Sequence, residues 1–136
     1  MEITKATIND LVYQVIGAAI EVHKKLGPGL LESVYHKCME EELQQKNIAF
    51  ESEKKVPIRY KSKTINANLR CDLFVESILI VELKAVENII PIHEAQIMTF
   101  MNLLKSPKGI LINFNSTNIF QFRQKTFVND LYRELS

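Results

Sequence analysis

Three charged residues, Asp72, Glu82 and Lys84, stand in apolar segments where charges are unexpected. Glu82 and Lys84 interrupt a run of largely β-branched residues over 78–86, which is typical of a buried strand. Because they are two apart, their side chains leave the same face of such a strand. An ionised carboxylate among apolar neighbours becomes neutral unless a cation or several hydrogen bonds stabilise its charge. The pattern therefore predicts a cleft or a charge partner at the end of this strand.

Asp72 is the candidate partner, because it lies ten residues earlier in a second strand-like run, 69–75. In an antiparallel hairpin the two carboxylates share a face only if their positions pair in even register. A three-residue loop over 76–78 gives that register. A two-residue loop sets Asp72 opposite Val81 and sends the two carboxylates to opposite faces.

Two close carboxylates suit a hard divalent cation such as Mg²⁺, which binds oxygen ligands and keeps waters that a phosphate can displace. Lys84 beside the metal can hold the attacking water and offset the charge of a phosphoryl transition state. The alternative for these three residues taken alone is an ordinary Glu-Lys pair at a strand end.

Two helices are expected before these strands. Apolar residues at helical spacing predict a first helix over 8–26, with Asn9 or Asp10 as its N-cap, and Gly27-Pro-Gly29 ends it before a second helix over 30–46.

Three residues of this helical hairpin are candidate site residues: Glu32, Tyr35 and His23. Glu32, in the first turn of the second helix, is either a third metal-binding carboxylate or a residue that stabilises the helix dipole. Tyr35 shares its face and is otherwise a core residue with a satisfied hydroxyl, and His23 is otherwise a packed or surface histidine.

The strands are expected to form an antiparallel meander over 48–60, 64–75 and 78–86. Pro57 indicates an edge strand or a bulge in the first of them. The turn and its flanks carry a basic cluster, which is either a phosphate-binding surface or a solvated hairpin: Lys54, Lys55, Arg59, Lys61 and Lys63.

A third helix is expected from Pro91 to about Leu104, with His93, Gln96 and Phe100 on one face. Gln96 is either a site residue or a solvent-facing one. A strand over 109–114 then arrives through this helix and should lie parallel to a central strand. A short edge strand over 119–123 and a terminal helix or tail over 127–135 complete the prediction.

Length and composition indicate one globular domain over residues 1–136, with 46% hydrophobic residues, 24% charged residues and a net charge of +1. Two cysteines, Cys38 and Cys71, are too few for a disulfide framework and lack metal-ligand spacing. The N-terminus has no signal pattern, and no apolar run approaches a membrane span. We therefore expect a cytoplasmic protein.

The order of elements resembles the core of the PD-(D/E)XK nuclease superfamily. More narrowly, Gly29-Leu-Leu-Glu32-Ser-Val-Tyr35 is similar to the signature of the bacterial GxxExxY proteins, which are assigned to that superfamily. Further segments that agree are 16–23, Arg70-Cys-Asp72-Leu, 80–86, His93-Glu-Ala-Gln96 and 111–115. The resemblance implies an α/β fold with a restriction-endonuclease-like three-layer core, an N-terminal helical hairpin, and a mixed four- to five-stranded sheet with an antiparallel meander and a crossover helix.

Carried over residue by residue, the resemblance makes Asp72 and Glu82 metal ligands and Lys84 the catalytic lysine. Glu32 becomes the acidic residue of the helical part, and Gln96 the polar residue of the helix that follows the Glu-x-Lys strand. The chain departs from the pattern in Cys71, which stands where the superfamily name has Pro, and in Phe100, which stands where related nucleases have Tyr.

Two functions follow. One is a Mg²⁺-dependent nuclease, with Mn²⁺ as a substitute metal and DNA favoured over RNA. The other is a non-catalytic nucleic-acid-binding or assembly module that retains the fold, since a small near-neutral domain has little surface for a duplex. Homodimerisation would enlarge that surface.

Overall fold

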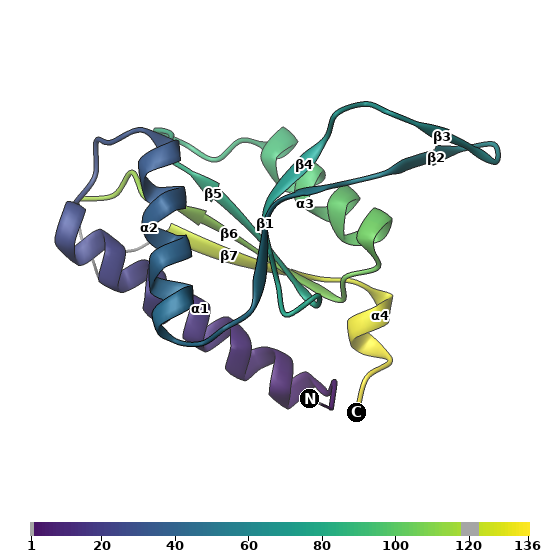
Figure 1. Cartoon of the computed structure of the whole chain (residues 1–136), viewed down its shortest axis with the longest axis horizontal. Coiled ribbons are helices and arrows are strands. Elements are labelled where there is room, and N and C mark those ends of the chain that lie inside the picture. The colour runs from purple at the N-terminus through teal and green to yellow at the C-terminus, as the bar shows by residue number, and fades with distance from the viewer. Residues whose placement is uncertain (1, 118–122) are drawn as a thin grey trace.

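The structure, a computed structural model, describes residues 2–117 and 123–136. A mixed five-stranded sheet with the order β1-β4-β5-β6-β7 forms its centre. The strands are β1 (Phe50–Lys55), β4 (Arg70–Val75), β5 (Leu79–Lys84), β6 (Lys108–Asn113) and β7 (Arg123–Val128). Helices α1 (Lys5–Leu26) and α2 (Glu32–Gln45) cover one face, and α3 (Pro91–Leu104) covers the other (Figure 1). The predicted three-layer α/β architecture is confirmed.

Helix α1 begins earlier than the sequence predicted, because Thr4 caps it. The Thr7 N–H donates to Thr4 Oγ1 at 3.1 Å, and the Thr4 N–H donates to Thr7 Oγ1 at 2.9 Å. This reciprocal pair satisfies two N–H groups at the helix start. Asn9 and Asp10 therefore lie inside the helix, and their prediction as N-caps was wrong.

The turn between α1 and α2 depends on two glycines. Gly27 has φ 68° and Gly29 has φ 97°, both in the left-handed region that residues with a Cβ rarely adopt. The chain can therefore reverse within a few residues, which places the start of α2 beside the sheet.

Strand β5 is the buried central strand that the sequence predicted. Leu79, Val81 and Leu83 pack in the core beneath α1 and α2, and Ile80 packs in the core beneath α3. As predicted, β6 arrives through α3 and pairs with β5 in parallel. The alternation of faces directs Glu82 away from the α1/α2 core.

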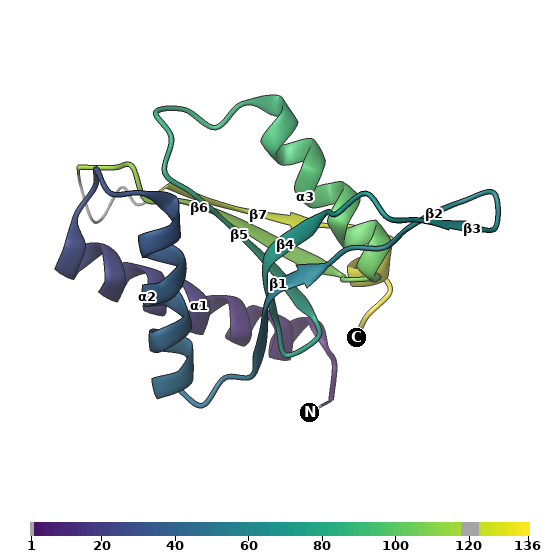
Figure 2. The same cartoon turned by 45° about the horizontal axis from the view of Figure 1, so that its top comes forward.

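The predicted continuous meander was wrong, because its first two strands split. Strands β2 (Ile58–Tyr60) and β3 (Lys63–Ile65) form a separate two-stranded sheet, and β1 pairs directly with β4. Residues 56–69, here called the arm, project from the body in both views (Figures 1 and 2). The Val56 N–H closes the base of the arm by donating to the Leu69 carbonyl at 2.9 Å. Pro57 follows at once and has no N–H for a continuing ladder.

The C-terminal prediction was only partly right. Residues 119–122 of the expected edge strand lie outside the described residues, and β7 extends to Val128, where a helix or tail was expected. A short helix, α4 (Asp130–Arg133), follows. Across residues 2–117 and 123–136, no helix is long and apolar enough to cross a membrane.

Candidate active site

The hairpin between β4 and β5 has the predicted register. Val75 pairs with Leu79, so residues 76–78 form the three-residue loop. Continuing this register along the strands sets Asp72 opposite Glu82, as the sequence required.

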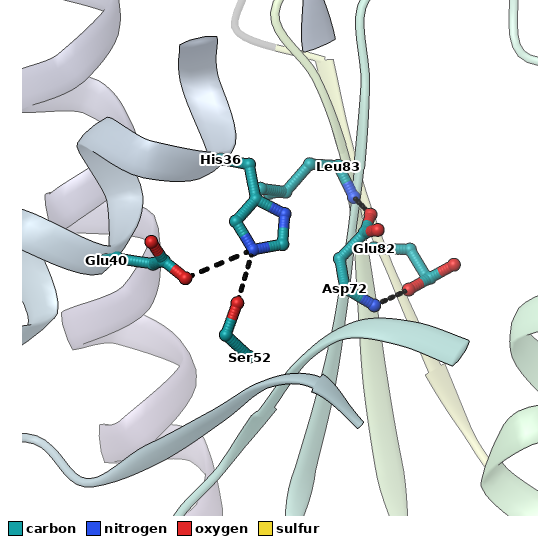
Figure 3. A network of polar contacts seen from close by, with 6 residues as sticks. All are labelled: His36, Glu40, Ser52, Asp72, Glu82 and Leu83. Atoms are coloured by element: carbon teal, nitrogen blue, oxygen red, sulfur yellow. Dashed lines mark hydrogen bonds and ion pairs between the residues drawn. The ribbon is translucent and has the colours of Figure 1, made fainter. Parts of the chain in front are cut away.

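Asp72 and Glu82 are held by crossed hydrogen bonds. The backbone N–H of Asp72 donates to Glu82 Oε2 at 2.6 Å, and the backbone N–H of Leu83 donates to Asp72 Oδ2 at 2.7 Å (Figure 3). The backbone pairing of β4 with β5 ends at Leu73 and Val81, one pair before Asp72 and Glu82. The two carboxylates therefore take the place of backbone carbonyl acceptors at this point. Each carboxylate uses one oxygen, and the second oxygen of each has no hydrogen-bond partner within the described residues.

Strand β4 loses its regular alternation at Asp72. Leu73 and Val75 pack beneath α1 and α2, yet Cys71, which a regular strand would place with them, packs beneath α3. Burial raises the pKa of the Cys71 thiol to about 12, so it stays neutral and packs as an apolar group. Asp72 accordingly lines a cavity beneath α2, whereas Glu82 is not among the residues lining it. The shared face that the sequence predicted for the two carboxylates was therefore not found: Asp72 lines the cavity beneath α2 and Glu82 does not, and the two residues are linked through backbone N–H groups where the strands separate.

Burial dominates the electrostatics of the acidic pair. The pKa of Glu82 is raised to about 8, chiefly by burial and next by the neighbouring Asp72 charge, against the opposing effects of the Asp72 N–H and Lys84. Burial also raises the pKa of Asp72, while the Leu83 N–H, His36 and Lys84 act in the opposite direction. The pair therefore holds protons more strongly than two exposed carboxyl groups, and a bound cation would compete with those protons.

Lys84 and Glu32 complete the group of charges. Lys84 is half-buried and forms no ion pair within 4 Å in the part of the chain that the structure describes. Burial raises the pKa of Glu32, and the Asp72 charge adds to this, whereas Lys84 and a backbone hydrogen bond with Ala85 lower it. The start of α2 thus brings Glu32 within electrostatic range of the residues on both strands.

His36 also belongs to this site, although the sequence analysis did not select it. With Glu32, Ser52 and Asp72 it lines the cavity of about 300 Å³ beneath α2. Its Nε2 lies 2.7 Å from Ser52 Oγ and 3.4 Å from Glu40 Oε2 (Figure 3). The spacing of four residues from Glu32, which places both on one helix face, was the signal available in the sequence.

Tyr35 has a structural role. Its ring is fully buried and stacks on Phe114 with the centroids 4.4 Å apart. Its hydroxyl donates to the Gly27 carbonyl at 2.6 Å and accepts the Leu30 N–H at 3.2 Å. Tyr35 thereby fixes the turn that leads into α2 and so positions Glu32 at its first residue.

The two candidate histidines lie in other environments. His23 is buried near the end of α1, with Nε2 at 2.7 Å from the Ser116 carbonyl oxygen. His93 Nδ1 accepts the Ile90 N–H at 3.2 Å, which caps the start of α3. Neither histidine lines the cavity that contains Asp72.

Gln96 is exposed on α3, whereas Phe100 of the same predicted face is buried in the core beneath that helix. No hydrogen bond joins Gln96 to the acidic residues within the described structure.

Asn113, another residue that the sequence analysis did not select, fixes the chain just after Lys84. Its buried amide donates to the Val86 carbonyl at 2.9 Å and accepts the Val86 N–H at 3.1 Å. The Phe114 N–H donates to the Lys84 carbonyl at 2.8 Å. These bonds hold the end of β5 against β6 and restrict the backbone that carries Lys84.

The chemistry of the donors fits an open cation site rather than a closed one. Among the described residues, no group of three or more His, Cys, Asp or Glu side chains is placed to hold a metal ion. Asp72 and Glu82 nevertheless offer two fixed carboxylates, each with one oxygen that is not used by a backbone N–H. Mg²⁺ is commonly bound by one or two carboxylates and keeps several waters.

A sequence model of the PD-(D/E)XK nuclease superfamily matches residues 9–125. The match covers most of the chain, including every residue of the acidic group, and the chain therefore belongs to this superfamily. Its mixed sheet between two helical layers agrees with the restriction-endonuclease-like fold. Neither a search of curated proteins nor a search of solved structures gave a match. The narrower similarity to the GxxExxY proteins stays a prediction.

Proposed function

We propose that this domain is a metal-dependent nuclease that hydrolyses phosphodiester bonds in DNA. The observation that carries the proposal is the crossed arrangement of Asp72 and Glu82, which fixes two carboxylates within electrostatic range of Lys84 where two strands separate. Membership of the nuclease superfamily supports a nucleic acid as the substrate.

In this proposal Asp72 and Glu82 hold Mg²⁺, or Mn²⁺ in its place, and Glu32 reaches the ion directly or through a water. The bound ion would supply a Lewis acid and lower the pKa of a coordinated water. The crossed backbone bonds orient both carboxylates before any ligand arrives, so little side-chain entropy is lost on binding.

Lys84 is the proposed catalytic residue for the attack on phosphorus. Its ammonium holds the attacking water and offsets the negative charge that gathers on the phosphoryl oxygens. Because Lys84 forms no close ion pair within the described structure, its ammonium is available for this contact. Gln96, exposed on α3, is assigned a contact with the substrate rather than with the acidic pair.

The proposal is tested by incubating pure protein with supercoiled, linear and single-stranded DNA and with RNA, in Mg²⁺ or Mn²⁺. We expect cleavage of DNA that stops in EDTA and in Lys84→Ala. Equal activity of Lys84→Ala would mean that a contaminating nuclease cuts the substrate.

A non-catalytic nucleic-acid-binding module is the second candidate function. The observation that favours it is that Asp72 and Glu82 both accept backbone N–H groups, which gives the two acids a structural role without a metal ion. Binding of nucleic acid without hydrolysis under any of these metal conditions would support this function over the first.

A further inference from the structure

The arm, residues 56–69, has a composition unlike the rest of the chain. From Lys54 to Cys71 the sequence contains no Asp or Glu. The same stretch contains six basic residues: Lys54, Lys55, Arg59, Lys61, Lys63 and Arg70. Since the whole chain carries a net charge of +1, the remainder carries −5. Three of these positive charges, Arg59, Lys61 and Lys63, lie on the arm itself, and the other three flank its base on β1 and β4.

These positive charges are largely free of carboxylate partners. Lys54 pairs with Glu51 at 2.9 Å, and it alone among the six forms an ion pair within the described residues. Every residue from 59 to 68 is exposed to solvent. Packing against the body therefore does little to stabilise this ribbon, and a two-stranded hairpin is marginally stable by itself.

The register of the arm distributes its cations over both faces. Arg59 pairs with Thr64, and Tyr60 pairs with Lys63, so Arg59 and Lys63 project from opposite faces of the ribbon. Lys61 lies in the turn at the tip, with its ammonium 5.5 Å from the centre of the Tyr60 ring. A ribbon with cations on both faces and at its tip can meet phosphates on the two walls of a groove.

The arm continues directly from the strands of the candidate active site. Its base follows β1, which carries Ser52, and precedes β4, which carries Asp72 two residues after Arg70. At about 3.3 Å per strand residue the tip extends roughly 20 Å from the base. The cavity at the site is lined by four acidic residues, Glu32, Glu40, Glu53 and Asp72, against one lysine, Lys37, so its lining as a whole repels a polyanion. The arm supplies the attraction that the cavity lacks.

We propose that the arm binds duplex DNA by entering its major groove and contacting phosphates with Arg59, Lys61 and Lys63. The major groove of B-form DNA admits a two-stranded ribbon, whereas that of A-form RNA is too deep and narrow. The proposal rests on the proposed function for its substrate class. The contacts carry no sequence information by themselves, because phosphates are the same at every position.

The test is the binding of a labelled 20-base-pair duplex in EDTA, measured by fluorescence anisotropy between 50 and 200 mM salt. Arg59→Gln, Lys61→Gln and Lys63→Gln combined should weaken binding at least tenfold at the lowest salt. If each residue contacts one phosphate, the slope of log K against log salt should fall by about 2.7. The matched control is Lys24→Gln, Lys46→Gln and Lys105→Gln combined, which removes the same charge from exposed positions elsewhere.

Equal losses in the two triple variants would overturn the proposal, since net charge alone would then explain binding. Tighter binding of single-stranded DNA, with Tyr60→Ala as the most damaging change, would replace groove entry by base stacking. A fall in molecular mass of the arm variant in sedimentation would instead make the arm a contact between copies of the chain. Absence of duplex binding by wild type would also overturn it.

The nuclease proposal can be tested independently of the arm proposal. Hydrolysis of a small phosphodiester, bis(4-nitrophenyl) phosphate, with Mn²⁺ needs the acidic site and no groove contact. We expect the arm triple variant to hydrolyse this substrate at the wild-type rate, whereas duplex cleavage at subsaturating DNA should fall in step with binding.

Discussion

The carboxylate of Glu82 accepts the backbone N–H of Asp72 at 2.6 Å, and the Asp72 carboxylate accepts the N–H of Leu83, the residue that follows Glu82. Each acid is therefore both a candidate ligand and a part of the pairing between its two strands. Alanine at either position would remove both functions at once. The amides keep an acceptor oxygen for the N–H and remove only the charge, so Asn and Gln are the informative substitutions.

The stability of the metal-free protein should depend on pH through Glu82. Its pKa is near 4.5 in the unfolded chain and about 8 in the fold. A raised acid pKa means that the folded state binds the proton more tightly, so stability is lost as pH rises from about 4.5 to about 8. Since a difference of one in pKa corresponds to about 1.4 kcal/mol, the loss is of the order of a few kcal/mol. Urea unfolding in EDTA at several pH values measures it.

Glu82→Gln is the comparison for this pH dependence. We expect the stability of the variant to decline less as the pH rises, and to exceed that of the wild type above pH 8, because an amide carries no charge to desolvate. The exposed Glu87→Gln should follow the wild type. If the free energy of unfolding changed with pH in the same way in the wild type and in Glu82→Gln, ionisation of Glu82 would not be the cause of the loss of stability.

Divalent cations should raise the melting temperature of the wild type. A ligand bound only by the folded state stabilises it by about 2.7 kcal/mol at a concentration of 100 Kd, which corresponds to several degrees. Mn²⁺ should give the clearer effect, because oxygen-rich sites generally bind it more tightly than Mg²⁺. Asp72→Asn should lose most of the increase, and the exposed Asp10→Asn should keep it. An equal increase in all three proteins would place the metal elsewhere.

The buried part of this fold was predictable because local pattern and tertiary environment agree there. The apolar run of β5, the crossover through α3 and the three-residue hairpin loop all follow from side-chain period and register. The arm was not predictable in this way. Its residues alternate loosely like those of a sheet strand, and Pro57 is the signal in the sequence that distinguishes a projecting ribbon from a continuous strand.

The candidate site was predictable where a charge interrupts an apolar strand, as at Asp72 and Glu82. His36 and Asn113 were not selected, because a polar residue on a charged helix, or at the end of a strand, is ordinary in sequence. Their roles depend on partners from distant segments: Ser52 for His36 and Val86 for Asn113. Neither the periodicity of side chains nor a motif in a single sequence indicates such a contact.

Tyr35→Phe should destabilise the protein by about 1 kcal/mol, because it removes a hydroxyl that bridges the Gly27 carbonyl and the Leu30 N–H. The ring should stay stacked on Phe114. Chemical denaturation measures the loss, and the exposed Tyr13→Phe is the matched control with no expected effect. A large fall in cleavage by Tyr35→Phe at temperatures where it is fully folded would instead give the hydroxyl a part in the reaction.

Lys84→Met separates an enzyme from a fold that merely binds metal. Methionine keeps much of the length of the side chain and removes the ammonium, so we expect cleavage to be abolished while the domain stays folded.

In EDTA the variant should be less stable than the wild type, because Lys84 lowers the pKa values of Asp72, Glu82 and Glu32 and so stabilises their charges. This deficit should be small at pH 4, where Glu82 with its pKa of about 8 is protonated, and should grow towards pH 9 as Glu82 ionises. Saturating Mn²⁺ should restore most of it, because the cation then stabilises the same carboxylates. The exposed Lys24→Met should show neither the deficit nor the loss of cleavage. A deficit that persists at saturating metal, together with a wild type that cuts no substrate, would make Lys84 a structural residue.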